Sequence, residues 1–224
     1  MKRRCALVKP GKLAYGDGLK LQHAAWNLVE SGDWVGILLL LEHLPVITLG
    51  KTYEETELLL PPESYREQGI ELAHCNRGGK TTCHNPGQLV GYPILNLAKW
   101  HQDSHRYLRE LEQVVMNTVN ALGITTSRKE GYTGVWTGER KIAAIGVNIR
   151  RWITSHGFAL NVNNDLSIFS QVVPCGIREF PVTSMAREGL TELTVEDTAE
   201  VLAGEFETVF TCSLVPVDGG VCHI

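Results

Sequence analysis

The sequence predicts an α+β fold in which a mixed β-sheet is flanked by helices. Its 224 residues contain long segments with helical spacing of apolar residues and short strand-like runs, and the two kinds intermix without strict alternation. That order is typical of an α+β domain, or of a mixed sheet with helices on its outer face. The hydrophobic content of 43% suits a globular protein with a substantial core. Because no repeat or linker-like stretch divides the chain, we expect a single domain over residues 1–224.

The helices are predicted by the spacing of apolar residues and by capping signals. Asp17 is the expected N-cap of the first helix, and Thr194 with Asp197 resembles a capping box at the start of the last one. The predicted helical segments are 17–31, 103–122 and 195–210, with a further short helix at the end of the proline-containing loop 58–68.

The strands are predicted by aliphatic and β-branched runs that are bounded by turn residues. The run over 35–50 is the most hydrophobic, but Glu42, His43 and Pro45 interrupt it, so it is too short to span a bilayer and indicates two buried strands. The predicted strands are 36–41, 46–49, 70–76 and 88–97, a hairpin over 132–151 that turns at 137–139, and a strand over 155–162.

Charge and cysteine content exclude several classes of protein. A net charge of −4 argues against general nucleic-acid binding. With neither a signal-peptide pattern nor a membrane span, the expected location is the cytoplasm. The six cysteines form no C-x-x-C pair, so we expect buried thiols rather than a disulfide framework. A local basic patch stays open as an interpretation, because the following cations might converge: Arg77, Lys80, Arg140, Lys141, Arg150 and Arg151.

The stretch RGGKTTCHNPGQ, residues 77–88, is the most informative segment of the first half. A phosphate-binding loop would need glycine at position 74, where the chain has His74, so that interpretation fails. A zinc site would use His74, Cys75, Cys83 and His84, but the two cysteines are eight residues apart rather than two to four. We therefore expect no metal here.

The remaining interpretations of this stretch are a turn and the wall of a pocket. Gly78 and Gly79 let the backbone approach a ligand closely, whereas the Pro86–Gly87 pair alone would suit a turn. A simple turn needs neither Arg77 before it nor His84 within it. We favour a pocket wall.

Cys175 stands between Pro174 and Gly176, so its thiol is expected on a shaped turn outside regular structure. A nucleophilic thiol needs a neighbouring cation or base. Lys141 and the histidines at 43, 84 and 156 are candidates, but sequence spacing does not decide which of them meets the thiol. A buried loop cysteine without chemistry remains the alternative.

Three blocks of the chain resemble the octanoyltransferase family. They are RGGKTTCHNPGQLVGYPILNL, GVWTGERKIAAIGVNIRRWITSHGFALNV and VVPCG, and LLLEHLPVITLGK matches the upstream strand pair of that family. Together the blocks cover residues 36–176 in the family's order. The fold implied by the resemblance is that of the biotin and lipoate protein ligase catalytic domains.

The resemblance also implies the roles of particular residues. The acyl-accepting nucleophile falls on Cys175 and the catalytic lysine on Lys141, while His43 and His156 are candidates for the pocket. The chain departs from the family at Cys83, which we expect to reshape the acyl pocket, and at Asn85, which we expect to strain the turn slightly. The implied substrate-contacting residues are Arg77, Gly78, Gly79, Lys80, Thr81, Thr82, Cys83, His84, Ala144, Ile145, Gly146, Gly157, Phe158 and Ala159.

The implied reaction moves an octanoyl group from octanoyl-acyl carrier protein to a lysine of a lipoyl domain, through an acyl thioester on Cys175. The implied acceptors are 2-oxoacid dehydrogenase E2 subunits and the glycine cleavage H protein. No cofactor, metal, nucleic acid or membrane is implied. Arg77, Lys80, Arg150 and Arg151 are candidates for binding the acidic carriers.

Three alternatives to this reaction remain. One is an ATP-dependent lipoate–protein ligase of the same fold. Another is a binding module that captures acylated carriers without catalysis. The third is a thiol hydrolase that would need a histidine beside Cys175.

Overall fold

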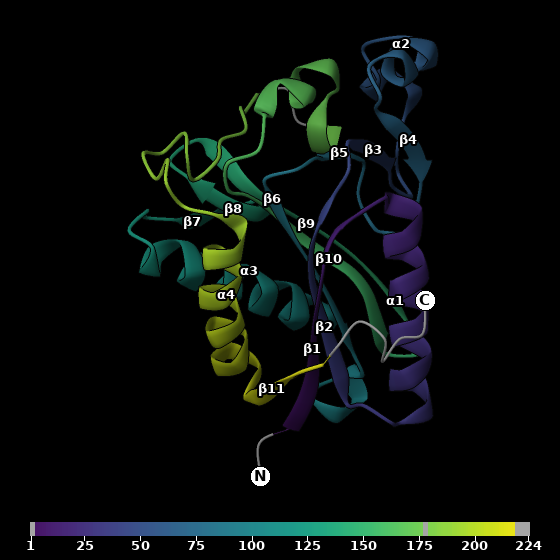
Figure 1. Cartoon of the computed structure of the whole chain (residues 1–224), viewed down its shortest axis with the longest axis vertical. Coiled ribbons are helices and arrows are strands. Elements are labelled where there is room, and N and C mark those ends of the chain that lie inside the picture. Colours follow the sequence, from purple (N-terminus) through teal and green to yellow (C-terminus); the bar gives the residue numbers. More distant parts are fainter. Residues whose placement is uncertain (1–2, 177–178, 218–224) are drawn as a thin grey trace.

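The computed structural model describes residues 3–176 and 179–217. Its main element is an eight-stranded sheet in the order β11–β1–β2–β6–β10–β9–β8–β7 (Figure 1). β1 pairs in parallel with β2 and β11, and the other neighbours pair antiparallel, so the predicted mixed sheet is confirmed. The strands are β1 (Arg3–Leu13), β2 (Gly36–His43), β6 (Gln88–Leu95), β7 (Ser127–Lys129), β8 (Tyr132–Thr137), β9 (Arg140–Arg150), β10 (Ile153–Asn161) and β11 (Cys212–Pro216).

A smaller sheet lies beyond one end of the main sheet (Figure 1). It consists of β4 (Glu71–His74), β3 (Val46–Leu49) and β5 (Thr81–His84), with β3 in the middle. β5 lies inside the glycine-rich stretch, where the sequence predicted no strand. All of its residues are buried, because it pairs with β3 on one edge and is covered by the turn around Cys175.

Helices cover both faces of the main sheet rather than a single outer face (Figure 1). α1 (Tyr15–Ser31) packs on one face, and α3 (Ser104–Ala121) and α4 (Val195–Phe210) pack on the other. The short helix α2 (Pro62–Glu67) lies beside the smaller sheet. The helical predictions are confirmed, including the capping box of α4. α1, however, begins two residues earlier than predicted, so Asp17 lies in its first turn. A carboxylate there stabilises the helix through its interaction with the helix dipole.

The position of β2 inside the main sheet, with helices over both faces, explains why its sequence contains a continuous apolar run. Leu38 and Leu40 pack toward α3 and α4, whereas Ile37 and Leu39 pack toward α1. Because successive side chains of a strand point to opposite faces, the part of β2 that is covered on both faces, residues 37–41, has no polar position. Within 3–176 and 179–217, no helix is long and apolar enough to cross a membrane.

The hairpin β8–β9 is paired only near its turn. β8 pairs with β9 from Arg140 to Ala143, and the register continues no further. Beyond that point one edge of β9 faces the glycine-rich loop, whose Gly78 N–H donates to the carbonyl of Val147 at 2.9 Å. Residues 144–149 are accordingly only half-buried, although most of them are apolar. The open edge leaves space beside β9.

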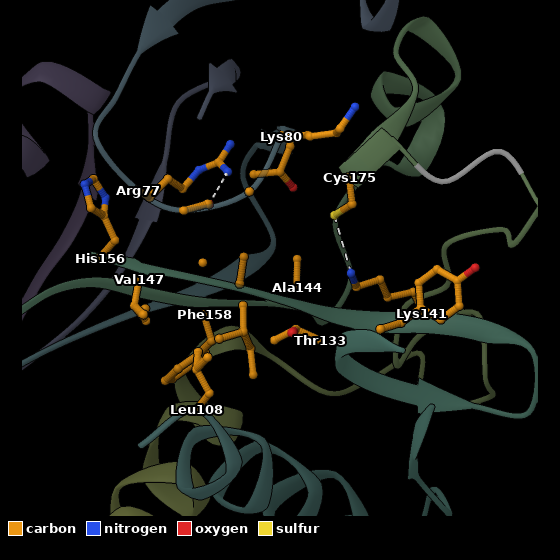
Figure 2. A pocket seen from close by; sticks show the side chains of 18 of the residues that line it. Arg77, Lys80, Leu108, Thr133, Lys141, Ala144, Val147, His156, Phe158 and Cys175 are labelled. Carbon is orange, nitrogen blue, oxygen red and sulfur yellow. Dashed lines mark hydrogen bonds between the residues drawn. The ribbon is translucent and has the colours of Figure 1, made fainter. Parts of the chain in front are cut away.

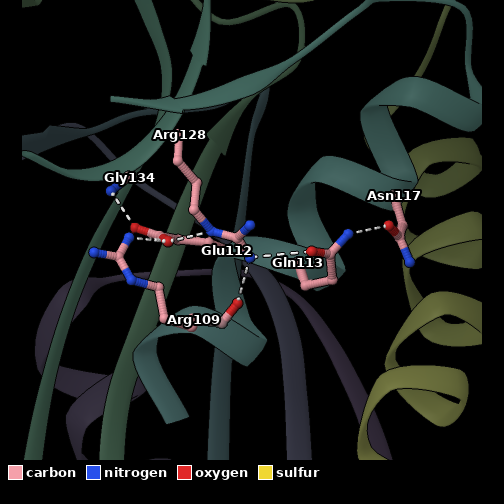
Figure 3. Close-up of polar contacts among 6 residues, drawn as sticks. All are labelled: Arg109, Glu112, Gln113, Asn117, Arg128 and Gly134. Carbon is pink, nitrogen blue, oxygen red and sulfur yellow. Dashed lines mark hydrogen bonds and ion pairs between the residues drawn. The ribbon is translucent and has the colours of Figure 1, made fainter. Parts of the chain in front are cut away.

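A buried carboxylate on α3 fixes β8 against the helix (Figure 3). Glu112 is fully buried and accepts hydrogen bonds from Arg109 at 2.6 Å and from Arg128 at 2.9 Å. Its other oxygen accepts from the backbone N–H of Gly134 at 3.1 Å. Two cations and a strand amide therefore compensate the buried charge, and the backbone of β8 is held at Gly134.

Candidate active site

Cys175 lies on a strained turn that packs beside β5. Its backbone is left-handed, with φ 57° and ψ 15°, and Gly176 follows with φ 68°. Such a conformation is uncommon for a residue with a side chain, and it often marks a functional site. The predicted shaped turn around the thiol is confirmed.

Lys141 of β9 meets this thiol. Its ammonium Nζ lies 3.4 Å from the Sγ of Cys175, although the two residues are 34 positions apart in sequence (Figure 2). The lysine is 8% exposed, so water reaches the pair on only part of its surface. A neighbouring ammonium favours the thiolate form of a cysteine, which is the nucleophilic form.

The Lys141 side chain is held between two residues of β8. On one side, the indole of Trp136 lies 5.5 Å from Nζ, measured to the ring centroid. On the other side, a Cβ at Gly134 would lie 2.6 Å from the Cε of Lys141, closer than side-chain atoms approach. Gly134 is the residue that Glu112 anchors. Because Gly134 has no side chain, the Lys141 side chain has the space that it needs to reach Cys175.

A cavity of about 580 Å³ extends from this pair along β9. Where it passes beneath the glycine-rich loop, its floor consists of small residues: Ala144 and Gly146 from β9, and Gly157 and Ala159 from β10. Of the residues implied by the resemblance, the wall contains Arg77, Gly78, Gly79, Lys80, Thr82, His84, Lys141, Ala144, Ile145, Gly146, His156, Gly157, Phe158, Ala159 and Cys175.

Two implied wall residues, Thr81 and Cys83, point away from the cavity because side chains alternate along β5. Thr81 donates its hydroxyl to Glu57 at 2.7 Å. The thiol of Cys83 lies in an apolar cluster behind the strand, where burial raises its pKa. The expectation that Cys83 reshapes the acyl pocket was therefore wrong.

The departure at Asn85 is also accommodated without strain. Asn85 does not have a positive φ, whereas Gly87, two residues later, has φ 89°. The Asn85 side chain donates to the carbonyl of Asp165 at 2.8 Å and accepts from Asn164 at 2.9 Å. The asparagine thus holds the turn to the segment that follows β10.

Arg77 braces the cavity wall from within. Arg77 is 8% exposed, and its guanidinium donates to the carbonyl and hydroxyl of Thr48, at 2.7 and 2.8 Å, and to the carbonyl of Gly78 at 3.2 Å. These contacts place the guanidinium inside the molecule, away from any carrier protein on the surface. The positive charge contributes to lowering the pKa of His84 and of His156.

Five aromatic side chains, which we call the ring cluster, close the cavity behind Arg77: Tyr15, His43, His84, Tyr92 and His156. His43 belongs to this cluster but lies one layer behind the wall, hydrogen-bonded through Nε2 to the Tyr92 hydroxyl at 2.7 Å. Its predicted place in the pocket is corrected accordingly. Sequence reasoning assigned no role to Tyr15, which belongs to no motif, or to Tyr92, which lies inside the block 77–97 that carries the family resemblance.

Burial keeps the histidines of the ring cluster neutral. Desolvation lowers the pKa of His43 to about 4 and that of His156 to about 4. His84 is lowered to about 3, also by desolvation first and then by the charge of neighbouring groups. Desolvation likewise raises the pKa values of the Tyr15 and Tyr92 phenols. At neutral pH the rings themselves are polar but uncharged, and the Arg77 guanidinium lies in front of them.

The candidate zinc ligands do not converge. His74 is exposed and packs against Tyr53, Cys75 donates to the carbonyl of Leu49, and Cys83 and His84 lie on opposite sides of β5. Within the described ranges, no group of three or more His, Cys, Asp and Glu side chains is placed to hold a metal ion.

Of the six cations considered as a basic patch, Arg77, Lys80 and Lys141 line the cavity, whereas the other three lie outside its wall. Arg150 lies nine residues along β9 from Lys141, or about 30 Å at the rise of a strand, and its guanidinium stacks on Trp26. Arg151 pairs with Glu30, and Arg140 pairs with Glu188. Lys80, which lines the cavity beside Gly176, pairs with Glu54 and Glu57.

Comparison with known proteins gives the class first. The family model of the lipoyl protein ligase A/B catalytic domain matches residues 14–207. A lipoate-protein ligase A bound with ATP superposes with a TM-score of 0.75 at 19% identity, over 97% of this chain and 89% of that one. A biotin protein ligase from Aquifex aeolicus, in complex with biotin and ATP, superposes with a TM-score of 0.56 at 13% identity, over 92% of this chain and 70% of that one. The fold is thus that of the lipoate and biotin protein ligases.

A curated relative narrows the class. The octanoyltransferase of Caldanaerobacter subterraneus subsp. tengcongensis is 45% identical over 216 residues, which is 96% of this chain and 94% of that protein. The chain belongs to the octanoyltransferase family and is an acyltransferase, as its sequence motifs predicted.

Proposed function

We propose that this enzyme transfers an octanoyl group from octanoyl-acyl carrier protein to a lysine of a lipoyl domain, through an acyl thioester on Cys175. One observation carries the proposal: Nζ of Lys141 lies 3.4 Å from Sγ of Cys175. That pair stands at the wall of a cavity with an apolar floor. A thiolate beside an ammonium can attack a carbonyl, and the cavity offers room for the chain attached to that carbonyl.

In the first half-reaction the Cys175 thiolate attacks the carbonyl carbon of the incoming thioester. A carbon–sulfur bond forms to Cys175, and the bond to the carrier sulfur breaks. The departing carrier thiolate takes a proton from the Lys141 ammonium, which becomes a neutral amine. One thioester replaces another, so the step is close to balanced in free energy and needs no ATP.

In the second half-reaction the neutral Lys141 amine acts as the base. It accepts a proton from the ε-amino group of the acceptor lysine as that group attacks the acyl carbonyl. The carbon–nitrogen bond of the amide forms, the bond to Cys175 breaks, and the thiolate beside an ammonium is restored. Both protonation states needed for the next cycle are regenerated, and conversion of a thioester to an amide is downhill.

The acceptors we propose are the lipoyl domains of 2-oxoacid dehydrogenase E2 subunits and the glycine cleavage H protein. The family model, which names lipoyl protein ligases, supports this class of acceptor. Affinity for the donor depends largely on its acyl chain, because each buried methylene contributes about 0.8 kcal/mol. The floor of alanine and glycine lets that chain lie close to the backbone of β9 and β10.

Intact-mass analysis after incubation with octanoyl-acyl carrier protein tests the covalent step. We expect one octanoyl adduct on the wild-type enzyme, located at Cys175 by peptide mapping, and none on Cys175→Ser. Cys75→Ser is the matched control, because Cys75 is also partly buried and lies outside the cavity wall. Octanoyl transfer at the wild-type rate by Cys175→Ser would overturn the covalent mechanism.

The second candidate is an ATP-dependent lipoate–protein ligase, whose fold this chain shares. A ligase activates free lipoate and needs no nucleophilic thiol, whereas here a thiol and a lysine face each other at the cavity wall. Release of pyrophosphate upon addition of ATP and free lipoate would favour the ligase. We expect none.

A further inference from the structure

The ring cluster forms a continuous wall at the end of the cavity that lies away from Cys175. Ring centroids are 5.3 Å apart for Tyr15 and His43, 5.7 Å for His43 and His84, 5.8 Å for His43 and Tyr92, and 6.1 Å for Tyr92 and His156. All five side chains belong to residues that are buried. An extended chain that reached this wall would meet rings rather than solvent.

The wall is also stiff, because hydrogen bonds fix its imidazoles. His43 donates through Nδ1 to the carbonyl of Leu13 at 3.1 Å and therefore accepts from the Tyr92 hydroxyl at Nε2. His84 lies 2.7 Å from the side-chain oxygen of Gln88, and His156 lies 2.6 Å from that of Asn76. A ring that moved aside would leave a buried polar atom without a partner, which is costly.

The floor between the reactive end of the cavity and the wall of rings is short. Cys175, Ala144 and Ala159 line the same small space at the reactive end. From Ala144 to Gly146 the floor advances by two strand residues, about 7 Å, and the next residue of β9, Val147, already pairs with His156. Figure 2 places His156 and Arg77 on the same side of the β9–β10 ribbon as Cys175.

We propose that the ring cluster is the end stop of the acyl slot and limits the length of the acyl chain that the enzyme accepts. This inference rests on the proposed function. It gives Tyr15, Tyr92 and the ring behind them at His43 a role in specificity, by limiting how far the chain extends from the thioester on Cys175.

Replacing Tyr15 lengthens the slot. We expect Tyr15→Leu to raise labelling of Cys175 by decanoyl carrier, relative to octanoyl carrier, by about tenfold, the scale set by burying two further methylenes. The measurement is intact-mass labelling at early times with hexanoyl, octanoyl, decanoyl and dodecanoyl carriers, so the ratios of initial rates give the profile within one preparation.

Gly18 provides a change in the opposite direction. A Cβ at this position of α1 would lie 2.5 Å from the Cε1 of His43, so Gly18→Ala displaces that ring, and we expect the displaced ring to narrow the end of the slot. We expect octanoyl labelling to fall by about tenfold relative to hexanoyl labelling. Gly16→Ala, on the same helix with nothing within 4 Å of its Cβ, is the matched control and retains the wild-type profile.

Each negative result has a distinct meaning. No adduct on the wild-type enzyme with any donor would overturn the proposed function itself. Normal labelling with an unchanged profile in both Tyr15→Leu and Gly18→Ala would overturn the end stop alone. The cavity also passes around β9 to Leu108, on the other side of the ribbon (Figure 2). If Leu108→Trp shifted the labelling profile toward shorter acyl chains while Tyr15→Leu left it unchanged, the acyl chain would lie in that branch of the cavity and the proposal would be wrong.

Discussion

The two ends of the cavity differ in how the protein treats ionisable groups. At one end Lys141, which is buried, faces the half-buried Cys175 across 3.4 Å. At the other end, burial lowers the pKa of three histidines to about 4 or below and raises those of two tyrosines. Under our two proposals, a cation therefore stands where the thiol reacts, and uncharged rings stand where the alkyl chain ends. Changes at the reactive end should alter rate, and changes at the ring end should alter stability and selectivity.

The largest expected effect is the loss of the ammonium at the reactive end. We expect Lys141→Ala to reduce octanoyl transfer by about 10²–10⁴-fold, because the variant lacks both the charge beside the thiol and the base for the acceptor amine. Alkylation of Cys175 by iodoacetamide at pH 7, followed by peptide mass spectrometry, should slow in parallel. Lys129→Ala is the control, since Lys129 also stacks on Trp136 but is not in contact with Cys175. Equal alkylation rates in Lys141→Ala and wild type would remove the activating role of Lys141.

The next effect is at Gly134, which leaves room for the lysine. A methyl group there would collide with the Lys141 side chain and with the carbonyl of Ala143. We expect Gly134→Ala to lower kcat by about 10–100-fold, the scale of a small displacement of a reacting group. Gly138→Ala, in the β8–β9 turn, also introduces a side chain at positive φ but meets nothing within 4 Å. If both variants lost activity equally, backbone strain rather than displacement of Lys141 would be responsible.

At the ring end the expected effect is on stability against pH. A histidine whose pKa falls from 6.5 in the unfolded chain to about 4 when folded, as for His43, binds its proton more readily when unfolded. Its contribution is therefore complete above pH 6.5 and decreases as the pH falls toward about 4. The loss is about 2 kcal/mol at pH 5 for His43 alone.

Urea unfolding at pH 7 and pH 5 measures this loss. His43 faces Tyr15 from α1, Tyr92 from β6 and His84 from β5, and none of these side chains supplies a negative charge at these pH values. His43→Gln should reduce the difference in unfolding free energy between the two pH values, and His23→Gln, on the exposed side of α1, should not. A difference unchanged by His43→Gln would show that the ring end does not disfavour protonation.

The smallest effect is expected far from both ends. Arg150→Ala should leave KM for octanoyl carrier protein within about twofold of wild type, which corresponds to the usual range of surface substitutions. Arg150 lies at the far end of β9, where it stacks on Trp26. Steady-state kinetics over carrier concentration give this value. A much larger rise in KM would mean that the carrier extends over the β9–β10 turn.

The sequence predicted the elements whose periodicity is strong, and it failed where tertiary pairing decides. The periodic helix over 103–122 became α3, and the hairpin over 132–151 became β8 and β9. β5 was missed because Thr81–His84 has no apolar alternation and is a strand only through its pairing with β3. That pairing determines which of its side chains face the cavity, and so explains the errors at Thr81 and Cys83.

The site could be predicted as far as its motifs extend. Cys175 and Lys141 were identified from the resemblance, and the structure brings them together. Tyr15 begins α1 and Tyr92 lies within β6, and nothing in their local sequence distinguishes them from core residues. Only the packing of α1 against the sheet places them in one wall with His84 and His156.

The early end of the pairing between β8 and β9 has a consequence for how this enzyme could have arisen or could be disabled. If β8 paired with β9 over the whole length of β9, the backbone of β8 would fill the space beside β9, and no room would remain there for a substrate. The space beside β9 thus exists because the hydrogen-bonded pairing between β8 and β9 stops at Ala143. We therefore expect that an insertion of a few residues that lengthened β8 would abolish activity, although Cys175 and Lys141 would be unchanged.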